Sequence, residues 1–346
     1  MEISRESIFL SSLRKFFHSF FGVIGFFIAL IPIIFILSIF GSDAEKISKN
    51  VLTYLPDLKG RSDVLPSSSP VILRININGE IGSEDLTWEQ IQSQLFESQK
   101  GALKQGRVKG ILLHLQTPGG GVNDSDMIYQ ILAAYKKQYN VPIYAFVDGI
   151  SASGGTYISC ASDKIFATPS SIVGSVGVIS GPYFNVSKTM EKVGLEALTF
   201  SEGKDKDMLN PTRPWKEKEG ESLTKIDEAS YEMFVDVVTK SRPKLDREKL
   251  INEYGAQVFI AKEAKDLGYI DEVGTYHDAL FSLLEEAKID PDKPYQVVEL
   301  KPKRRWIADL VRGESLLNGK LKHSLHLGGE QKANSSGIMY LYNPAQ

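Results

Sequence analysis

The residues best suited to chemistry are a serine among small residues and a glycine-rich turn that precedes it. Ser153 is followed by Gly154 and Gly155, and the turn runs from Gly119 to Gly121. A serine on a tight strand-to-helix turn presents its hydroxyl as a nucleophile, and the amide of the next residue, Gly154, is then free to bind a developing oxyanion. Ser-Gly-Gly is also a common loop sequence, so the motif alone is only a hypothesis of catalysis.

A serine nucleophile needs a base, and the histidines are poorly placed to supply one. No histidine lies between Ser153 and Tyr276, and His114 is flanked by leucines, which is typical of a core histidine. A Ser-His-Asp triad is therefore poorly supported, and lysine is the remaining candidate. The chain has five histidines: His18, His114, His277, His323 and His326.

Lys204 and Lys206 are the lysines that could act as the base. A lysine accepts a proton only when it is neutral, so its pKa must fall from about 10.4 by about three units, which costs about 4 kcal/mol. Burial among apolar groups can supply such a shift, but the segment 204–211 is polar. The residues around these lysines indicate a solvated loop and leave the base unidentified.

The amino terminus predicts a membrane anchor. From Phe16 to Gly41 there is no Asp, Glu, Lys or Arg, and a helix needs about 20 apolar residues to cross a bilayer. The segment is too long for a signal peptide and lacks an Ala-x-Ala cleavage pattern, so we expect an uncleaved anchor. Arg14 and Lys15 precede it, whereas Asp43 follows it, which places the amino terminus in the cytoplasm and the bulk of the protein outside it.

Composition limits the remaining classes. A chain of 346 residues with 42% hydrophobic content can bury one substantial core. Its net charge of −3 and the lack of a basic stripe argue against nucleic acid as a partner. The single cysteine, Cys160, excludes an intrachain disulfide and a cysteine-built zinc site. We expect neither a metal nor a cofactor.

Apolar strands alternate with helices in the central region, which predicts an α/β fold with a mainly parallel sheet. Both glycine-rich turns then lie where a strand ends and a helix begins. The predicted strands cover residues 71–77, 111–115, 143–147, 165–167, 176–179 and 339–342, and the predicted helices cover 123–132, 156–161, 223–238 and 261–267. The expected organisation is a cytoplasmic segment 1–15, an anchor 16–41, a linker 42–69, a catalytic domain 70–290 and a C-terminal extension 291–346.

Four motifs in this order resemble the signal peptide peptidase A (SppA) family in its short, membrane-anchored, single-domain form. They are Thr117-Pro118-Gly119-Gly120-Gly121, Ser151-Ala152-Ser153-Gly154-Gly155-Thr156-Tyr157, Gly174-Ser175-Val176-Gly177-Val178-Ile179 and Lys206-Asp207-Met208-Leu209-Asn210-Pro211-Thr212-Arg213. The resemblance implies a Clp-protease/crotonase-like fold, one N-terminal transmembrane helix and a Ser-Lys protease.

The resemblance also implies residue roles. The nucleophile matches Ser153, and the base matches Lys206, because the family's lysine precedes a segment that ends in Pro-x-Arg; Lys204 is the alternative if the register slips by two. Ser175 matches the serine that orients the lysine. The oxyanion donors match the backbone amides of Gly154 and, in the Gly119 to Gly121 turn, Gly120.

Two departures from the family pattern concern this site. Ser151 stands where the family commonly has alanine, so it is a minor rival for the nucleophile. Asp205 adds a carboxylate next to Lys206, which would hold the lysine protonated if it were close. We expect Asp205 to point outward.

The resemblance implies peptide substrates, namely remnant signal peptides and other apolar or unfolded segments. It implies location in the bacterial cell membrane, with contact to lipid through residues 16–41 and the protease domain on the extracytoplasmic side. Such chains form homo-oligomeric rings or domes, for example octamers. Two other classes stay open, which are a proteolytically inactive membrane scaffold and a crotonase-type enzyme that acts on acyl thioesters.

Overall fold

The computed structural model describes residues 8–41, 50–301 and 339–341. The chain divides into two compact units, Met1–Lys49 and Asn50–Gln346. The first unit contains the helix α1 (Ile8–Gly41), in which the segment Ser12–Pro32 has a mean hydropathy of 1.7 and no buried residue. Its length and composition fit a membrane anchor or a signal sequence.

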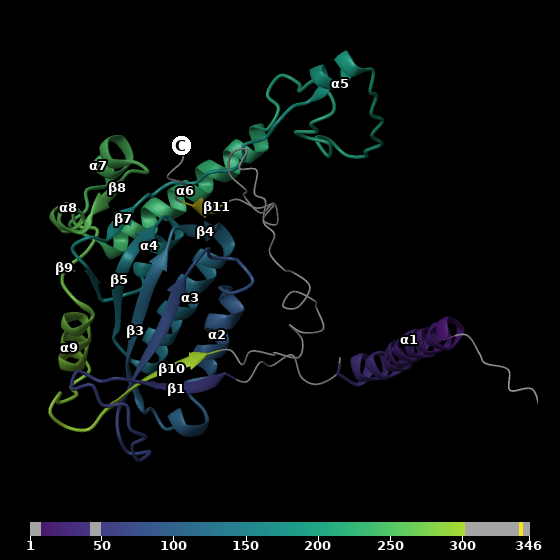
Figure 1. Cartoon of the computed structure of the whole chain (residues 1–346). Coiled ribbons are helices and arrows are strands. Elements are labelled where there is room, and N and C mark those ends of the chain that lie inside the picture. The colour runs from purple at the N-terminus through teal and green to yellow at the C-terminus, as the bar shows by residue number, and fades with distance from the viewer. Residues whose placement is uncertain (1–7, 42–49, 302–338, 342–346) are drawn as a thin grey trace, which may run out of the picture. The chain divides into compact units, whose positions relative to one another are not determined.

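The second unit is built on a mainly parallel sheet (Figure 1). The strands run in the order β1-β10-β2-β3-β5-β6-β9, and β7 joins β5 to β8. Only the pairs β1–β10 and β7–β8 of this sheet are antiparallel. A second, two-stranded sheet pairs β11 with β4. The strands are β1 Val51–Leu55, β2 Val71–Asn78, β3 Val108–Thr117, β4 Gly119–Gly121, β5 Ile143–Ala152, β6 Lys164–Ala167, β7 Ile172–Gly174, β8 Val258–Ile260, β9 Glu272–Val273, β10 Gln296–Lys301 and β11 Met339–Leu341.

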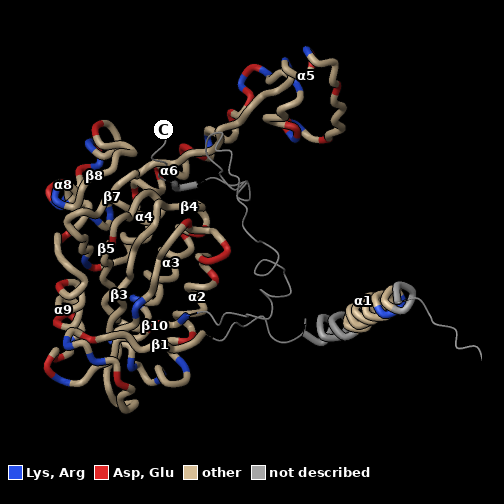
Figure 2. Tube along the Cα trace, viewed as in Figure 1, with Lys and Arg blue, Asp and Glu red and all other residues tan. Residues whose placement is uncertain are grey.

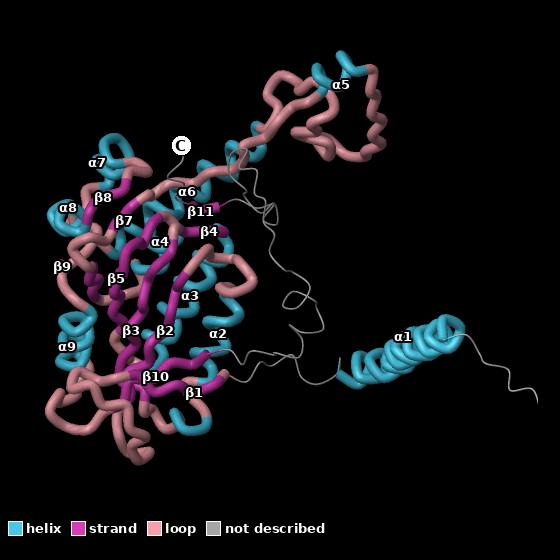
Figure 3. Tube along the Cα trace, viewed as in Figure 1, coloured by secondary structure: helices cyan, strands magenta, loops and turns pink. Residues whose placement is uncertain are grey.

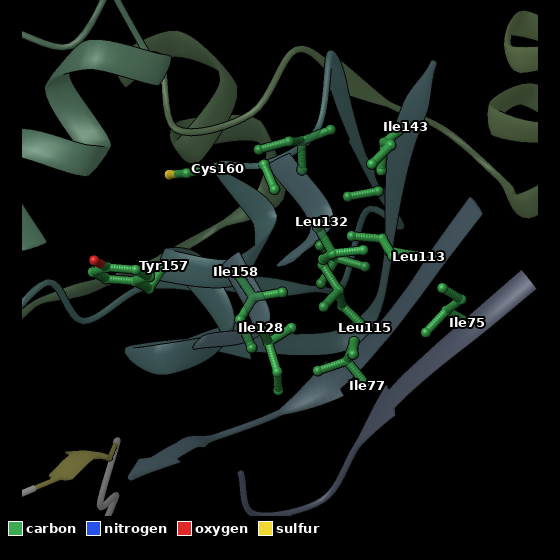
Figure 4. Packing of buried hydrophobic residues seen from close by; sticks show 14 of the residues in the cluster. Ile75, Ile77, Leu113, Leu115, Ile128, Leu132, Ile143, Tyr157, Ile158 and Cys160 are labelled. Carbon is green, nitrogen blue, oxygen red and sulfur yellow. The ribbon is translucent and has the colours of Figure 1, made fainter. Parts of the chain in front are cut away.

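Helices cover both faces of this sheet (Figure 3). Side chains alternate along a strand, so Ile75 and Leu113 pack toward α3 on one face, whereas Ile72 and Leu112 pack toward α9 on the other. Figure 4 shows the first of these clusters, with Ile128 of α3 and Ile158 of α4. The helices are α2 Trp88–Glu97, α3 Val122–Tyr139, α4 Gly154–Ser159, α5 Ser187–Val193, α6 Glu221–Ser241, α7 Arg247–Lys249, α8 Ala261–Leu267 and α9 Tyr276–Glu286, with short turns of helix at Gly101–Leu103 and Leu250–Tyr254.

The predicted α/β class and the mainly parallel sheet are confirmed by the strand pairing. The strand predicted at 176–179 is wrong, because β7 ends at Gly174 and the positive φ of Ser175 turns the chain out of the extended conformation. The helix predicted from residue 123 begins at Val122, directly after the glycine turn, with Gly121 as its N-cap.

Two strands of the sheet come from segments that we assigned to a linker and to an extension. Strand β1 lies within 42–69, and β10 lies within 291–346. Strand β10 pairs with β2, and β1 pairs with β10. The sheet therefore extends beyond the boundaries 70–290 that the sequence suggested for the catalytic domain.

A long arm, which lies within residues 177–233 and carries α5, projects from the body of the second unit (Figure 1). No residue between 177 and 233 is buried. Several large apolar side chains of the arm face solvent, among them Phe184 (73% exposed), Leu198 (80%) and Phe200 (87%). An apolar surface of this kind is typical of a contact with another protein or another copy of the chain.

Candidate active site

Ser153 lies on the sharp turn between β5 and α4, at the carboxyl end of the central strand. Its backbone has φ 55° and ψ −116°, a conformation that costs a non-glycine residue about 1–3 kcal/mol. The turn is held from both sides, because the Ser153 N–H donates to the Gly174 carbonyl (2.9 Å) and the Tyr157 N–H donates to the Ser153 carbonyl (3.0 Å). The strand-to-helix turn expected from the sequence is present.

The Ser153 hydroxyl is buried but has no hydrogen-bond partner among the described residues. Its residue is 1% exposed, and Oγ is one of the buried side-chain oxygens without a partner. A buried hydroxyl without a partner is costly, and such groups concentrate at functional sites. The strained backbone and the unpartnered hydroxyl together single out this serine.

Ser151, the minor rival, lies in a different environment. It pairs with Thr117 of β3 on one side and with Val173 of β7 on the other, so it is inside the sheet. Its Oγ also lacks a partner, and a Cβ on Gly155 would lie 3.1 Å from it. The Ser151 hydroxyl is therefore packed beneath α4 and does not stand on the turn.

The backbones of Gly120 and Gly154 approach each other closely next to Ser153. A Cβ on Gly154 would lie 3.4 Å from the Gly120 nitrogen, so Gly120 and Gly154 are in close contact. The neighbouring amides are occupied, since the Gly119 N–H donates to Thr117 Oγ1 (3.1 Å) and the Gly121 N–H donates to the Ile81 carbonyl (2.9 Å).

Successive peptide groups of an extended strand point in opposite directions, so the Gly120 N–H faces away from Ile81. The Gly154 N–H belongs to the first turn of α4, where amides have no partner within the helix. The same alternation turns the Gly120 N–H toward the other edge of β4, where strand β11 pairs with it and Tyr340 lies opposite Gly120. The Gly120 amide is therefore the one of the three that is bound neither to Thr117 nor to Ile81, and it can act with that of Gly154 on an oxyanion when β11 does not occupy this edge.

Side-chain hydroxyls that the sequence reasoning missed hold these turns in place. Thr156 Oγ1 lies 2.8 Å from the carbonyl oxygens of both Ser151 and Gly174, and so ties the nucleophile strand to β7. Thr117 Oγ1 donates to the Gly79 carbonyl (2.6 Å). Neither contact has a local sequence signal, because the partners are distant in the chain.

Ser175 is close to Ser153, as the sequence suggested. Its preceding residue, Gly174, pairs with Ala152 and accepts the Ser153 N–H. Ser175 is 5% exposed and has a positive φ of 57°, and its own N–H donates to the Gln257 carbonyl (2.7 Å). Two strained serines therefore lie at the ends of adjacent strands.

Lys206 is not near these groups within one chain. It lies on the projecting arm, which Figure 1 shows apart from the junction of β5 and α4. Lys206 and Lys204 are both exposed, and the Lys206 N–H donates to the Gly203 carbonyl (3.3 Å) of the same loop. Asp205 is also exposed. The single chain does not assemble a Ser-Lys dyad.

His114 belongs to the opposite face of the sheet. Its ring stacks on Phe146, and its Nε2 lies 3.3 Å from Asp148 Oδ2. Burial and the Arg74 guanidinium, 3.3 Å from Nδ1, lower the pKa of His114 below its usual range. Because Phe146 packs toward α9 and α4 lies on the other face, His114 is a satisfied core histidine.

Strand β11 lies directly against the glycine turn. It pairs antiparallel with β4, with Tyr340 opposite Gly120 (Figure 1). On the other edge of β4, Ile81 forms a parallel bridge to Gly120. The sequence predicted a strand at 339–342, but its place on the glycine turn is known only from the structure.

Within the part of the chain that the structure describes, no group of three or more His, Cys, Asp or Glu side chains could hold a metal ion.

Comparisons with known proteins found relatives of this chain. A family model described as "Peptidase family S49" matches residues 135–290. A putative signal peptide peptidase SppA from Enterococcus faecium is 34% identical over 275 residues, which cover 76% of this chain and 76% of that protein. A chloroplastic serine protease SPPA from Arabidopsis thaliana is 29% identical over 262 residues, which cover 72% of this chain and 38% of that protein. Among solved structures, a ClpP1 mutant from Listeria monocytogenes matches 60% of this chain and 94% of its own, with a TM-score of 0.40 and 18% identity.

Proposed function

Since the chain belongs to peptidase family S49 and is an SppA-like serine protease, we propose that Ser153 is its nucleophile and that Lys206 of a neighbouring copy is its base. The observation that carries the proposal is the buried Ser153 hydroxyl, which has no partner among the described residues, on a turn where the backbones of Gly154 and Gly120 approach each other closely. This arrangement fits acyl transfer, which needs a nucleophile beside two donors for the oxyanion.

The proposed reaction has two steps. Neutral Lys206 takes the proton of the Ser153 hydroxyl while Oγ attacks the peptide carbonyl carbon, and the amides of Gly154 and Gly120 bind the oxyanion. The lysine then gives the proton to the departing amine, which leaves an acyl-enzyme. Lys206 next takes a proton from water while the water oxygen attacks the acyl carbon, and it gives that proton to Ser153 Oγ as the ester bond breaks and the carboxylic acid leaves. The proposed role of Ser175, whose strand adjoins that of Ser153, is to accept a hydrogen bond from the lysine amine and orient it.

The neighbouring copy is needed because one chain leaves Lys206 in solvent. The same arm exposes Phe184, Leu198 and Phe200, and docking on a second copy would cover them while it delivers the lysine. The proposed assembly is a closed homo-oligomer, a ring or dome such as an octamer. The arm of one copy would bind the Ser153 site of the next, and a repeated contact between two unlike surfaces forms a ring when its rotation closes.

The proposed substrates are remnant signal peptides and other apolar or unfolded segments. Strand β11 supports this proposal, because it shows that an extended segment can pair with the Gly119–Gly121 strand. Backbone pairing on a strand edge accepts many sequences, as long as the segment is unfolded. A crotonase-type thioester enzyme would need no such strand edge.

We further propose that α1 is an uncleaved anchor in a bacterial cell membrane, with the amino terminus in the cytoplasm. Arg14 and Lys15 lie at the start of the apolar segment, which supports this orientation. The protease unit would then lie on the extracytoplasmic side, where secretion leaves signal peptides.

A fluorophosphonate, which reacts with activated serines, tests the nucleophile. We expect mass spectrometry of the assembled protein to find the label on Ser153, and Ser153→Ala to abolish labelling. The matched control is Ser151→Ala, which should keep the label. Its free energy of unfolding should stay within about 1 kcal/mol of the wild type, because it removes a hydroxyl that has no partner. A label that persists in Ser153→Ala would contradict the assignment and favour the scaffold alternative or another serine.

A further inference from the structure

The loop that carries Lys206 has a defined conformation although it contains no buried residue. Residues 201–219 are all exposed or half-buried. Three of them that are not glycine have positive φ, namely Asp205 (59°), Leu209 (59°) and Lys218 (61°), and each costs about 1–3 kcal/mol. Since no core packing holds this loop, polar contacts must supply the restraint.

Arg213 provides most of these contacts. Its Nε donates to Asp207 Oδ2 (2.7 Å), and its Nη2 donates to the Asp207 carbonyl (2.9 Å) and to Oδ1 (3.2 Å). Its Nη1 and Nη2 donate to the two carboxylate oxygens of Glu219 (both 3.0 Å). One guanidinium thus binds both carboxylates and the backbone of the residue that follows Lys206.

Glu219 extends the same network to the far side of the loop. Its carboxylate accepts the backbone N–H groups of Leu209 (2.6 Å) and Lys216 (2.8 Å), and its side chain is only 6% exposed. We call Asp207, Arg213 and Glu219 the lysine-loop clamp. An isolated surface ion pair adds little stability, but a guanidinium shared by two carboxylates with bidentate geometry is the exception.

Both carboxylates of the clamp stay ionised over the whole pH range in which a lysine could lose its proton. The hydrogen bonds from Arg213 lower the pKa of Asp207, and together with two backbone N–H groups they lower the pKa of Glu219 to about 2. Because the pKa of Glu219 is lowered, its ionised carboxylate stabilises the fold at pH values above 4.5, the ordinary pKa of a glutamate. This contribution is lost as the pH falls toward about 2. The clamp is therefore intact at neutral and alkaline pH.

We propose that the lysine-loop clamp positions Lys206 for proton transfer and that Arg213 offsets the negative charge of Asp207 beside it. The proposal rests on the proposed role of Lys206 as the base. An unpaired carboxylate next to Lys206 would favour its ammonium form, which cannot accept the Ser153 proton. Asp207, Arg213 and Glu219 are positioning residues, because they act through Lys206 and do not touch the reacting atoms.

Besides Lys206 and the clamp, the charged residues of segment 201–219 are Glu202, Lys204, Asp205, Lys216, Glu217 and Lys218. Lys216 Nζ lies 4.0 Å from Asp207 Oδ1, and Lys204 and Asp205 precede Lys206 in the exposed loop. From α6, which adjoins the loop through the contact of Ser222 with Met208, Glu221 pairs with Lys225. Figure 2 shows both signs of charge along the arm. Arg213 is the cation that binds Asp207 most closely.

The test is the pH profile of kcat/KM for Arg213→Gln. We expect kcat/KM at its optimum to fall about 10- to 100-fold, because the loop loses its restraint. We also expect the acidic limb of the profile to move to higher pH by about 0.5–1 unit, because the unpaired Asp207 carboxylate favours the ammonium form of Lys206. In Asp207→Asn/Arg213→Gln both charges are gone, so the limb should return to the wild-type pH while the rate stays low.

Two further variants separate charge from geometry. Arg213→Lys keeps the positive charge but loses the planar guanidinium that binds two carboxylates. The acidic limb of its pH profile should therefore stay near the wild-type pH, while kcat/KM falls about tenfold. If Arg213→Gln does not assemble, Asp207→Asn alone tests the charge effect. The acidic limb of its pH profile should move to lower pH, because a carboxylate beside Lys206 has been removed. A fall in rate without movement of the limb in Arg213→Gln or Asp207→Asn would overturn the proposal.

Lys206→Ala, measured beside these variants, separates this inference from the proposed function. If Lys206→Ala keeps wild-type activity, Lys206 is not the base and the proposed function fails. If Lys206→Ala is inactive but neither charge variant moves the limb, the base assignment stands and only the role of the clamp is refuted.

Discussion

Replacing Ser153 by alanine is expected to reduce cleavage of an unfolded apolar peptide by at least about 10³-fold, and replacing Lys206 by alanine is expected to do the same. Each substitution removes one of the two groups that move the proton, and neither group has a substitute among the described residues near Ser153. The measurement is kcat/KM on a fluorogenic peptide, with light scattering or sedimentation to show that each variant still assembles.

Mixing the two inactive variants gives the more decisive result. Subunits of Ser153→Ala still carry Lys206, and subunits of Lys206→Ala still carry Ser153. If each site combines Ser153 of one copy with Lys206 of the next, random co-assembly restores both groups at about a quarter of the sites. We therefore expect co-expressed variants to recover about a quarter of the wild-type activity.

A dyad within one chain would give a different outcome, because every subunit of the mixture would be defective and no activity would return. The matched control is co-expression of wild type with Ser153→Ala/Lys206→Ala, which fixes how strongly inactive subunits dilute activity. Full activity in either single variant would refute the Ser-Lys mechanism itself.

The sequence was sufficient to predict the strand-to-helix turn that carries Ser153, because the signals for that turn are local. The small residues around Ser153, the apolar run of β5 before it and the glycine turn after β3 each predict backbone geometry within a few residues. Parallel strands place their carboxyl ends at one edge of a sheet. This rule is why the turns that carry Ser153 and Gly120 could be expected to meet. The place of Ser175 was expected only from the family resemblance, because a strand was predicted after it, at 176–179.

The base could not be placed in the same way. The segment around Lys206 is polar, and one chain leaves it in solvent, so neither its composition nor the single chain defines where the amine acts. Exposed apolar residues of the arm, such as Phe200, indicate a contact with another surface, and the proposed intermolecular site depends on that contact.

Other errors have equally physical causes. Strands β1 and β10 lie in segments that look like a linker and an extension, because strands of five and six residues carry little periodicity. Strand β7 was expected at 176–179, where the apolar residues are. The three residues that pair with β5 instead precede Ser175, whose positive φ ends the strand. Such a turn is specified by its tertiary contacts and not by its own residue types.

Replacing Gly120 by alanine is expected to reduce kcat about 10²- to 10³-fold, the usual effect of losing one oxyanion donor. Gly120 has φ 155°, and a Cβ there would lie 2.0 Å from the Ile81 carbonyl oxygen and 2.6 Å from its nitrogen. Both atoms are backbone, so rotation of a side chain cannot relieve the clash. The glycine strand has to move, and the Gly120 N–H moves away from the Gly154 N–H.

The neighbouring residue provides a matched control for this prediction. A Cβ on Gly121 would meet nothing closer than 3.7 Å, at Asp124 Oδ2, and its N–H is already bound to Ile81. Gly121→Ala should therefore lower kcat by less than about tenfold. Because the lost interaction forms mainly in the transition state, kcat should fall in Gly120→Ala while KM changes little. Equal losses in the two variants would show that the strand as a whole matters and that Gly120 donates no specific hydrogen bond to the oxyanion.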